Sequence, residues 1–235
     1  MEWIQSTLRF KSDQSRYKFQ LVHFDNPDFP VVKGEIYTGV EFLQRLEKAQ
    51  DELGSVLWLD AINLFLPFVC SDISRSRKSH QPLSLLCLGE GTGACGIGMS
   101  ATNFFNRTVI TDLEPLLPLL QLNASLNESC EAYSLDWMNR SAFFSDQKNS
   151  HNFDIVVGCE VLYGNRFAWP DLLGTILDSV RDSSSIVYIC VTLRNARHDL
   201  EDFWNNYLSN HFSQISEFEL SDNVSVIKAT GLVSN

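Results

Sequence analysis

A short apolar run that leads directly into a glycine-rich turn is the strongest constraint in this sequence. The run Leu83 to Leu88 is followed at once by Gly89, Gly91 and Gly93. Such glycines let the backbone turn sharply and approach a ligand closely. The helix expected over residues 94–102 presents free N–H groups in its first turn. The spacing therefore predicts a strand, a ligand-binding loop and a helix, in that order.

An acidic residue follows the next expected strand. Residues 108–111 are β-branched, and Asp112 comes directly after them. An acid about twenty residues beyond such a loop accepts hydrogen bonds from the two hydroxyls of a ribose. The structural alternative is a tight turn in which Asp112 only caps a helix. Loop and acid together favour a nucleoside cofactor.

Strands and helices alternate through the second part of the chain. Strands are expected over 83–88, 108–111, 132–135, 153–158 and 186–192, and helices over 94–102, 115–127 and 168–181. This alternation predicts an α/β fold with a mainly parallel sheet that is covered on both faces. After a helix over 199–210, strands over 212–220 and 224–229 are joined by a short polar turn, which predicts an antiparallel C-terminal hairpin.

The N-terminal part has a different pattern. Residues 6–33 are expected to be extended, because apolar positions alternate from Tyr17 to His23, with a turn at 26–30. Two helices, about 43–53 and 55–69, precede an exposed polar loop over 71–80. No Pro/Gly/Ser-rich linker divides the chain. We therefore expect one domain over 1–235, with an N-terminal β/α extension (1–54) and an α/β core (55–235).

The charge and the polar residues exclude several classes of protein. The chain has 235 residues, with 18 Lys and Arg against 29 Asp and Glu, a net charge of −11. Such a chain repels phosphates, so no nucleic-acid partner is expected, and a basic partner fits better than an acidic one. An acidic surface that merely keeps the protein soluble is the alternative.

Neither the cysteines nor the histidines form a metal-binding or disulfide pattern. The six cysteines contain no CxxC pair, and the five histidines are scattered, so we expect no metal and no disulfide framework. No signal peptide or membrane span is expected either. The interpretation is a cytoplasmic protein, with the nucleus as an alternative, that is a monomer or forms transient complexes.

The glycine pattern permits two kinds of cofactor. Gly91 to Gly96 matches G-x-G-x-x-G, which is typical of dinucleotide sites. The glycine next to the strand is Gly89, however, and Gly89 to Gly93 reads G-x-G-x-G, the form typical of S-adenosylmethionine enzymes. The C-terminal hairpin also differs from a dehydrogenase, whose second half adds parallel strands. S-adenosylmethionine is favoured, and a nicotinamide-dependent oxidoreductase is the alternative.

Five segments resemble, in order, the motifs of the seven-β-strand protein-lysine methyltransferases of the methyltransferase-like 21 type. They are Val56 to Ala61, Leu85 to Ile97, Val109 to Asn123, Leu135 to Trp137 and Phe153 to Tyr163. The resemblance covers about residues 55–207. It implies a seven-strand Rossmann-like methyltransferase sheet and S-adenosyl-L-methionine as the cofactor.

The resemblance also implies which residues hold that cofactor. The loop would pass under its methionine part with Gly89, Glu90, Gly91 and Gly93. Asp112 would hold the ribose. Trp137 and Cys159 would border the adenosine, and Trp58 would close one side of the pocket. For the two tryptophans, ordinary core packing is the alternative.

Two residues depart from the family's motifs. The family usually has an acid two residues before the first glycine, where this chain has Cys87. The family's D-x-x-Y is here Glu160 to Tyr163. The resemblance implies that Glu160 holds the incoming substrate ammonium by charge-assisted hydrogen bonds and that Tyr163 shapes the lysine channel. A strand-end cap and a packed aromatic are the structural alternatives.

The sequence therefore predicts an S-adenosylmethionine-dependent methyltransferase that acts on lysine in a protein substrate. Two alternatives stay open at this point. One is a weakly active or inactive methyltransferase fold that serves as a binding module, which Cys87 and Glu160 favour. The other is a methyltransferase for histidine, arginine or a small molecule, because the methyl-donor site says little about the acceptor.

Overall fold

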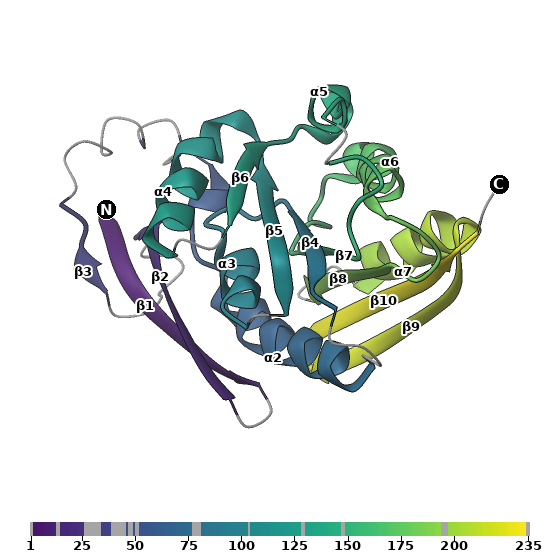
Figure 1. Cartoon of the computed structure of the whole chain (residues 1–235), viewed down its shortest axis with the longest axis horizontal. Coiled ribbons are helices and arrows are strands. Elements are labelled where there is room, and N and C mark those ends of the chain that lie inside the picture. Colours follow the sequence, from purple (N-terminus) through teal and green to yellow (C-terminus); the bar gives the residue numbers. More distant parts are fainter. Residues whose placement is uncertain are drawn as a thin grey trace.

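The main sheet has seven strands in the order β6-β5-β4-β7-β8-β10-β9 (Figure 1). The computed structural model describes residues 2–12, 15–25, 34–38, 46, 49, 52–76, 81–102, 104–127, 130–146, 149–193 and 197–233. Five neighbouring strands are parallel: β4 (Leu83–Leu88), β5 (Phe105–Asp112), β6 (Glu131–Ser134), β7 (Ile155–Cys159) and β8 (Ile186–Thr192). The predicted α/β fold with a mainly parallel sheet is confirmed.

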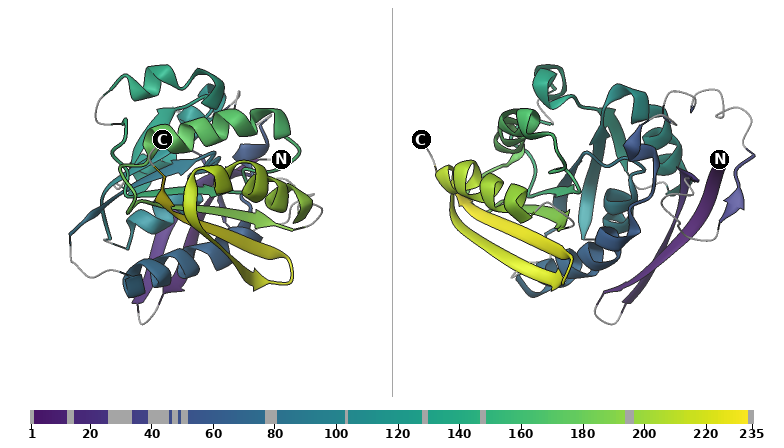
Figure 2. Two further views of the ribbon diagram at one scale, coloured as in Figure 1. Left: turned by 90° about the vertical axis from the view of Figure 1, so that its right-hand side faces the viewer. Right: turned by 180° about the vertical axis from the view of Figure 1, so that it is seen from behind.

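The C-terminal hairpin completes the sheet. It consists of β9 (Phe212–Ser221) and β10 (Val224–Leu232), and β10 inserts between β8 and β9, antiparallel to both. The predicted antiparallel hairpin is confirmed. It lies at one end of the molecule, and the N-terminal hairpin lies at the other (Figures 1 and 2).

Both faces of the sheet are covered, because successive side chains of the buried strands point to opposite faces. On one face, Leu85 and Cys87 of β4 pack in a cluster with α2 (Leu59–Ser76) and α3 (Ala94–Ser100). On the other, Leu86 and Leu88 pack with α5 (Ser141–Phe144), α6 (Trp169–Ser179) and α7 (Arg197–Asn206). Continuous apolar strands are the pattern expected for such a doubly covered sheet.

The N-terminal segment forms a second, smaller sheet. Its strands are β1 (Trp3–Ser12), β2 (Ser15–Phe24) and the short β3 (Glu35–Ile36), in the order β2-β1-β3. The prediction that residues 6–33 are extended is correct for the part that forms the antiparallel strands β1 and β2. The predicted turn at 26–30 and most of the predicted helix over 43–53 lie outside the described residues.

Two asparagines attach this sheet to the core. They lie one turn apart on α4 (Leu117–Asn127), which follows the short 3-10 helix η3 (Glu114–Leu116). Asn123 bonds both the N–H (2.6 Å) and the carbonyl (2.8 Å) of Val22, and Asn127 does the same for Gln20 (2.9 and 2.7 Å). The side-chain amides therefore pair with β2 as a neighbouring strand would.

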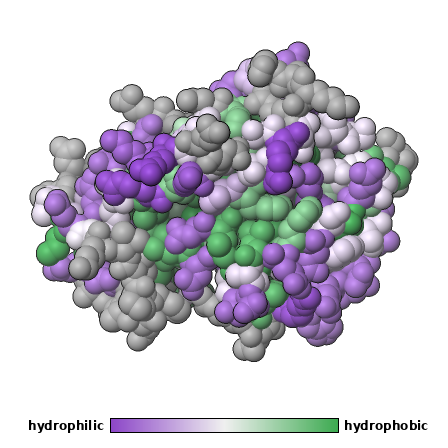
Figure 3. All heavy atoms as spheres, turned by 90° about the horizontal axis from the view of Figure 1, so that it is seen from below, coloured by the Kyte–Doolittle hydropathy of each residue, from purple (hydrophilic) through white to green (hydrophobic). Residues whose placement is uncertain are grey.

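The helix predicted over 55–69 begins later and ends later. Residues 53–55 form a 3-10 helix, η2 (Leu53–Ser55), and α2 continues to Ser76. The first half of the predicted loop 71–80 is therefore helical, and that prediction was wrong. The reason is that Ile73 is buried, four residues after Val69, and extends the apolar stripe of the helix. From below, the face on which α2 lies shows a hydrophobic patch ringed by hydrophilic residues (Figure 3).

Candidate active site

A cavity of about 870 Å³ lies at the carboxyl ends of β4, β5, β7 and β8. This volume lies in the range of sites that hold drug-sized ligands. β5 pairs with one edge of β4, and β7 pairs with the other edge. The direction in which strands are added to the sheet therefore reverses at β4. Ligands of open α/β sheets bind at such a switch point.

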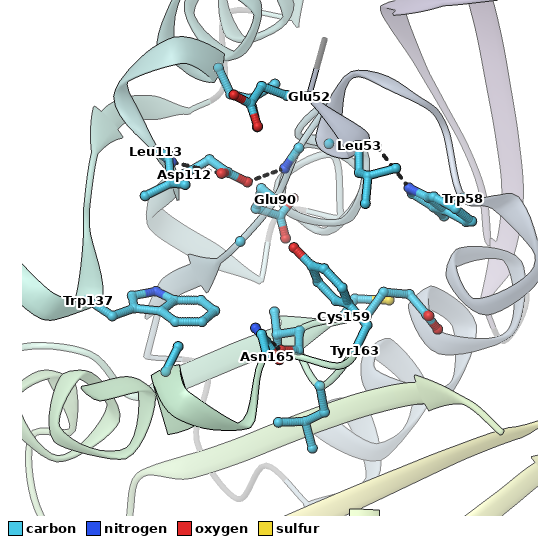
Figure 4. Close-up of a pocket in the computed structure, with 18 of the residues that line it drawn as sticks. Glu52, Leu53, Trp58, Glu90, Asp112, Leu113, Trp137, Cys159, Tyr163 and Asn165 are labelled. Atoms are coloured by element: carbon cyan, nitrogen blue, oxygen red, sulfur yellow. Dashed lines mark hydrogen bonds between the residues drawn. The ribbon is translucent and has the colours of Figure 1, made fainter. Parts of the chain in front are cut away.

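Nine of the ten site residues proposed from the sequence line this cavity (Figure 4). They are Trp58, Gly89, Glu90, Gly91, Asp112, Trp137, Cys159, Glu160 and Tyr163. Gly93 is the exception. It lies at the N-cap of α3 with φ +82°, and a side chain there would press on the buried Ile97, Ile110 and Leu120. Gly93 therefore shapes the turn from the core side.

The glycine loop packs closely against η2. Gly91 has φ +57°, and a Cβ there would collide with the carbonyl oxygen of Gly54. Only glycine permits both the conformation and this close approach. The Gly91 N–H donates to Asp112 Oδ2 at 2.7 Å, which fixes the loop against the end of β5.

Asp112 is the central acceptor of the site. Besides Gly91, the N–H of Leu113 donates to its Oδ1 at 2.7 Å. Burial raises the pKa of Asp112 to about 6, although the two backbone N–H groups act in the opposite direction. Asp112 is therefore mostly ionised at neutral pH. Each carboxylate oxygen has a second lone pair, which leaves capacity for hydroxyl donors.

Glu90 turns inward from the loop. Its Oε2 accepts from the Gly96 N–H at 2.8 Å, while Oε1 is buried without a conventional hydrogen bond to any described residue. Burial raises the pKa of Glu90 to about 8, and the charge of Asp112 adds to the shift. Its carboxyl group lies beside the thiols of Cys87 and Cys95, whose pKa values burial raises above the ordinary range. The carboxyl group nearest to the side chain of Cys87 therefore comes from position 90 of the loop.

Glu160 holds a strained position at the end of β7. Its φ is +61°, which is uncommon for a residue with a long side chain. Its Oε1 accepts from both the N–H and the hydroxyl of Thr192, each at 2.6 Å, and this fixes the carboxylate between the ends of β7 and β8. Observed strain in a cavity wall motivates a functional hypothesis.

Aromatic side chains stand on several sides of the cavity (Figure 4). Trp58 donates from Nε1 to the carbonyl of Leu53 (3.2 Å), and Trp137 lies across the cavity, against Gly89. The Tyr163 hydroxyl points toward the centre. Burial, with the charges of Asp112 and Glu52, raises the pKa of Tyr163, so its hydroxyl keeps its proton.

Cys159 is a wall residue rather than a nucleophile. A hydrogen bond with the Cys190 thiol, together with burial, raises its pKa well above the ordinary range. The neutral thiol is a poor nucleophile.

Sequence reasoning missed several residues of the cavity wall. Leu113, Asp136, Met138, Phe167 and Thr192 all line it. Asp136 also caps η4 (Trp137–Asn139) by accepting from the Met138 N–H. Their position in the sequence could have identified most of them, because they lie at the carboxyl end of a parallel strand or within a few residues after it.

Two features are absent from the part of the chain that the structure describes. No group of three or more His, Cys, Asp or Glu is arranged to hold a metal ion. No described helix has the length and apolar character that crossing a membrane requires.

Comparison with known proteins places the chain among methyltransferases. Over 151 residues it is 30% identical to the protein-lysine N-methyltransferase EFM6 of Saccharomyces cerevisiae. The aligned region covers 57% of this chain and 61% of EFM6. The chain thus spans less than two thirds of that relative.

Solved structures share the fold. The carbon methyltransferase CurJ has a TM-score of 0.56 at 17% identity, covering 74% of this chain and 54% of that one. The branched-chain polyamine synthase of Thermus thermophilus, solved with N4-aminopropylspermidine and 5'-methylthioadenosine, has a TM-score of 0.51 at 14% identity, covering 65% and 51%. Residues 40–210, most of the chain, match the family described as lysine methyltransferase. The chain therefore belongs to the lysine methyltransferase family.

Proposed function

We propose that the protein transfers a methyl group from S-adenosylmethionine to a lysine of a protein substrate. The observation that carries this proposal is the pairing of the Gly91 loop with Asp112 at the floor of the cavity (2.7 Å). Membership of the lysine methyltransferase family supports lysine as the residue that accepts the methyl group.

The residues present fit the cofactor. Asp112 has the acceptor capacity that two ribose hydroxyls need. The charged residues that line the cavity are all acidic, and none of the described lining residues is Lys, Arg or His. This suits a ligand with a sulfonium and an ammonium group, and aromatic faces such as those of Trp137 and Tyr163 attract cations as well.

The cofactor, when bound, supplies an electrophilic methyl group. The chain's own residues then need to position a neutral amine. Lysine has a reference pKa of about 10.4, so its neutral form costs roughly 4–5 kcal/mol at pH 7. Glu160, fixed by Thr192, holds the arriving ammonium by a charge-assisted hydrogen bond. Tyr163 lines the channel, and the apolar walls lower the cost of the neutral form by excluding water.

The finer features of the partner are part of the proposal. The acidic cavity favours a substrate that is basic around its lysine. All six cysteines are free thiols, which is consistent with action in the cytoplasm or the nucleus. We propose a monomer that meets its substrate transiently.

A binding module without turnover is the second candidate. The occupied Oε1 of Glu160 favours it, since the N–H and the hydroxyl of Thr192 already donate two hydrogen bonds to that oxygen. Cofactor binding without methyl transfer to any protein is the outcome that would support it.

Calorimetric titration tests the cofactor site. Wild type is expected to bind S-adenosylmethionine and not NAD. Asp112→Ala should weaken binding by roughly 1.5–3 kcal/mol, because it removes charge-assisted hydrogen bonds. Asp222→Ala, in the exposed turn between β9 and β10, is the matched control and should bind as wild type. Unchanged affinity in a folded Asp112→Ala variant would remove Asp112 from the site.

A further inference from the structure

Exposed apolar side chains gather around the cavity mouth. Among the described residues, eight large hydrophobic side chains are exposed, and five of these also line the cavity. We call these five the apolar rim: Leu53, Leu113, Met138, Tyr163 and Phe167. Exposed apolar residues that occur singly need no explanation, but a concentration at a cavity mouth marks a binding surface.

Four of the five residues of the apolar rim divide into two halves according to the strand that they follow, and Leu53 lies in η2. Leu113 and Met138 follow β5 and β6, on the side where Asp112 lies, and this half belongs to the cofactor under the proposed function. Tyr163 and Phe167 follow β7, on the side where Glu160 meets Thr192. Under the proposed function, that half faces the acceptor.

Phe167 is held in its exposed position by its neighbours. It lies in η5 (Arg166–Ala168), and 79% of its surface is exposed. Arg166 pairs with Asp199 (2.9 Å) and Asp202 (2.7 Å) of α7 and lies over the ring of the buried Trp169, 5.2 Å from its centre.

Asn165 fixes the segment from the other side. Its side chain accepts from Trp169 Nε1 (3.2 Å) and donates to the carbonyl of Val161 (3.2 Å). A segment fixed from both sides loses little backbone entropy when a partner covers its aromatic ring, which is a property of a binding anchor.

We propose that Phe167, together with Tyr163 in the same half of the apolar rim, docks an apolar side chain that neighbours the acceptor lysine in an extended segment of the substrate protein. This inference rests on the proposed function. The charge complements it: Glu160 lines the same half, so the site offers a carboxylate for the lysine and an apolar edge for its neighbour. Phe167 thereby determines specificity and takes no part in the chemistry.

Methylation of defined peptides tests the proposal. The probes are short peptides with a central lysine and serine or glycine elsewhere, in which one flanking position at a time is leucine or phenylalanine. Radiolabelled S-adenosylmethionine is the donor. Wild type should methylate peptides with an apolar residue at a preferred flanking position at least about tenfold faster in kcat/KM than the all-polar peptide.

Phe167→Ala should abolish this preference through KM, while the calorimetric affinity for S-adenosylmethionine stays unchanged. Phe167→Leu should restore part of the preference. Val233→Ala, which removes an exposed apolar residue outside the cavity, is the matched control and should behave as wild type.

Three results would overturn the proposal: wild type without a flanking preference, a Phe167→Ala variant that retains it, or transfer to proteins of a soluble cell extract with none to any peptide. If neither peptides nor extract proteins are methylated although the cofactor binds, the proposed function itself is wrong, and the inference that rests on it is wrong too.

Discussion

Glu160 combines a strained backbone conformation with two hydrogen bonds to its side chain. Its φ of +61° is costly for glutamate, and the two hydrogen bonds from Thr192 hold it there. Aspartate visits the left-handed region more readily than glutamate does, because its short side chain bonds locally. The carboxylate at this position is therefore placed by the ends of two strands.

We predict that Glu160→Gln lowers kcat about 100-fold or more, because the substrate ammonium loses the charge that positions it. Cofactor affinity should change little. Glu160→Asp should keep activity, since it preserves the charge and relieves the backbone. Methyl transfer and calorimetric titration are the measurements. A Glu160→Gln variant that transfers methyl groups at the wild-type rate would make the Thr192 contact purely structural.

At the scale of elements, the glycine loop contains a buried acid whose protonation is linked to folding. The folded-state pKa of Glu90 is raised to about 8 from an ordinary 4.5. Between these pH values the folded state binds more protons than the unfolded state, so stability falls as pH rises. The slope from this one group is at most about 1.4 kcal/mol per pH unit. Asp112 adds a slope of the same sign up to about pH 6.

Glu90→Gln should therefore flatten the profile. Near pH 4.5 the variant and wild type are expected to unfold at similar denaturant concentrations. At pH 8 the variant should be the more stable, because it has no charge to bury. Urea unfolding across this range is the measurement. Parallel profiles for the two proteins would show that Glu90 is not buried as a raised-pKa acid.

Asn123 links three elements through one buried amide. In addition to its two bonds with Val22 of β2, its Nδ2 donates to the carbonyl of Thr92 in the glycine loop at 2.8 Å. The N-terminal sheet and the cofactor loop therefore share a support on α4.

Asn123→Ala should destabilise the protein by roughly 3 kcal/mol, because it leaves buried polar groups without partners. Asn127→Ala is the matched control. Its bonds to Gln20 are exposed, water replaces them, and the loss should stay below about 1.5 kcal/mol. Urea denaturation compares the two. Equal losses would contradict the central role of Asn123.

The elements were predictable from the sequence where local pattern decides them. The β4–loop–α3 unit follows from apolar residues and glycines that are neighbours in the chain, and Asp112 follows from its place after a strand. The support from Asn123 was not predictable, because Val22 lies about a hundred residues away and amide pairing leaves no periodic signal. Nor was the inward turn of Glu90, which depends on the space beside Cys87. Phe167 was missed because an exposed aromatic lacks any apolar periodicity.

At the scale of the whole molecule, the fold gathers an acidic cavity, the buried carboxylate of Asp112 and exposed aromatic side chains at the carboxyl ends of the parallel strands. Hairpins lie at both ends of the molecule, and helices pack on both faces of the main sheet. A net charge of −11 also favours encounter with basic partners.

Mass spectrometry of a soluble cell extract, incubated with the purified protein and S-adenosylmethionine that carries a deuterated methyl group, tests the central claim most directly. The account predicts deuterated methyl groups on lysine in one or a few proteins, with little labelling by Glu160→Gln. Cofactor binding without any labelled protein, or label confined to residues other than lysine, would contradict it.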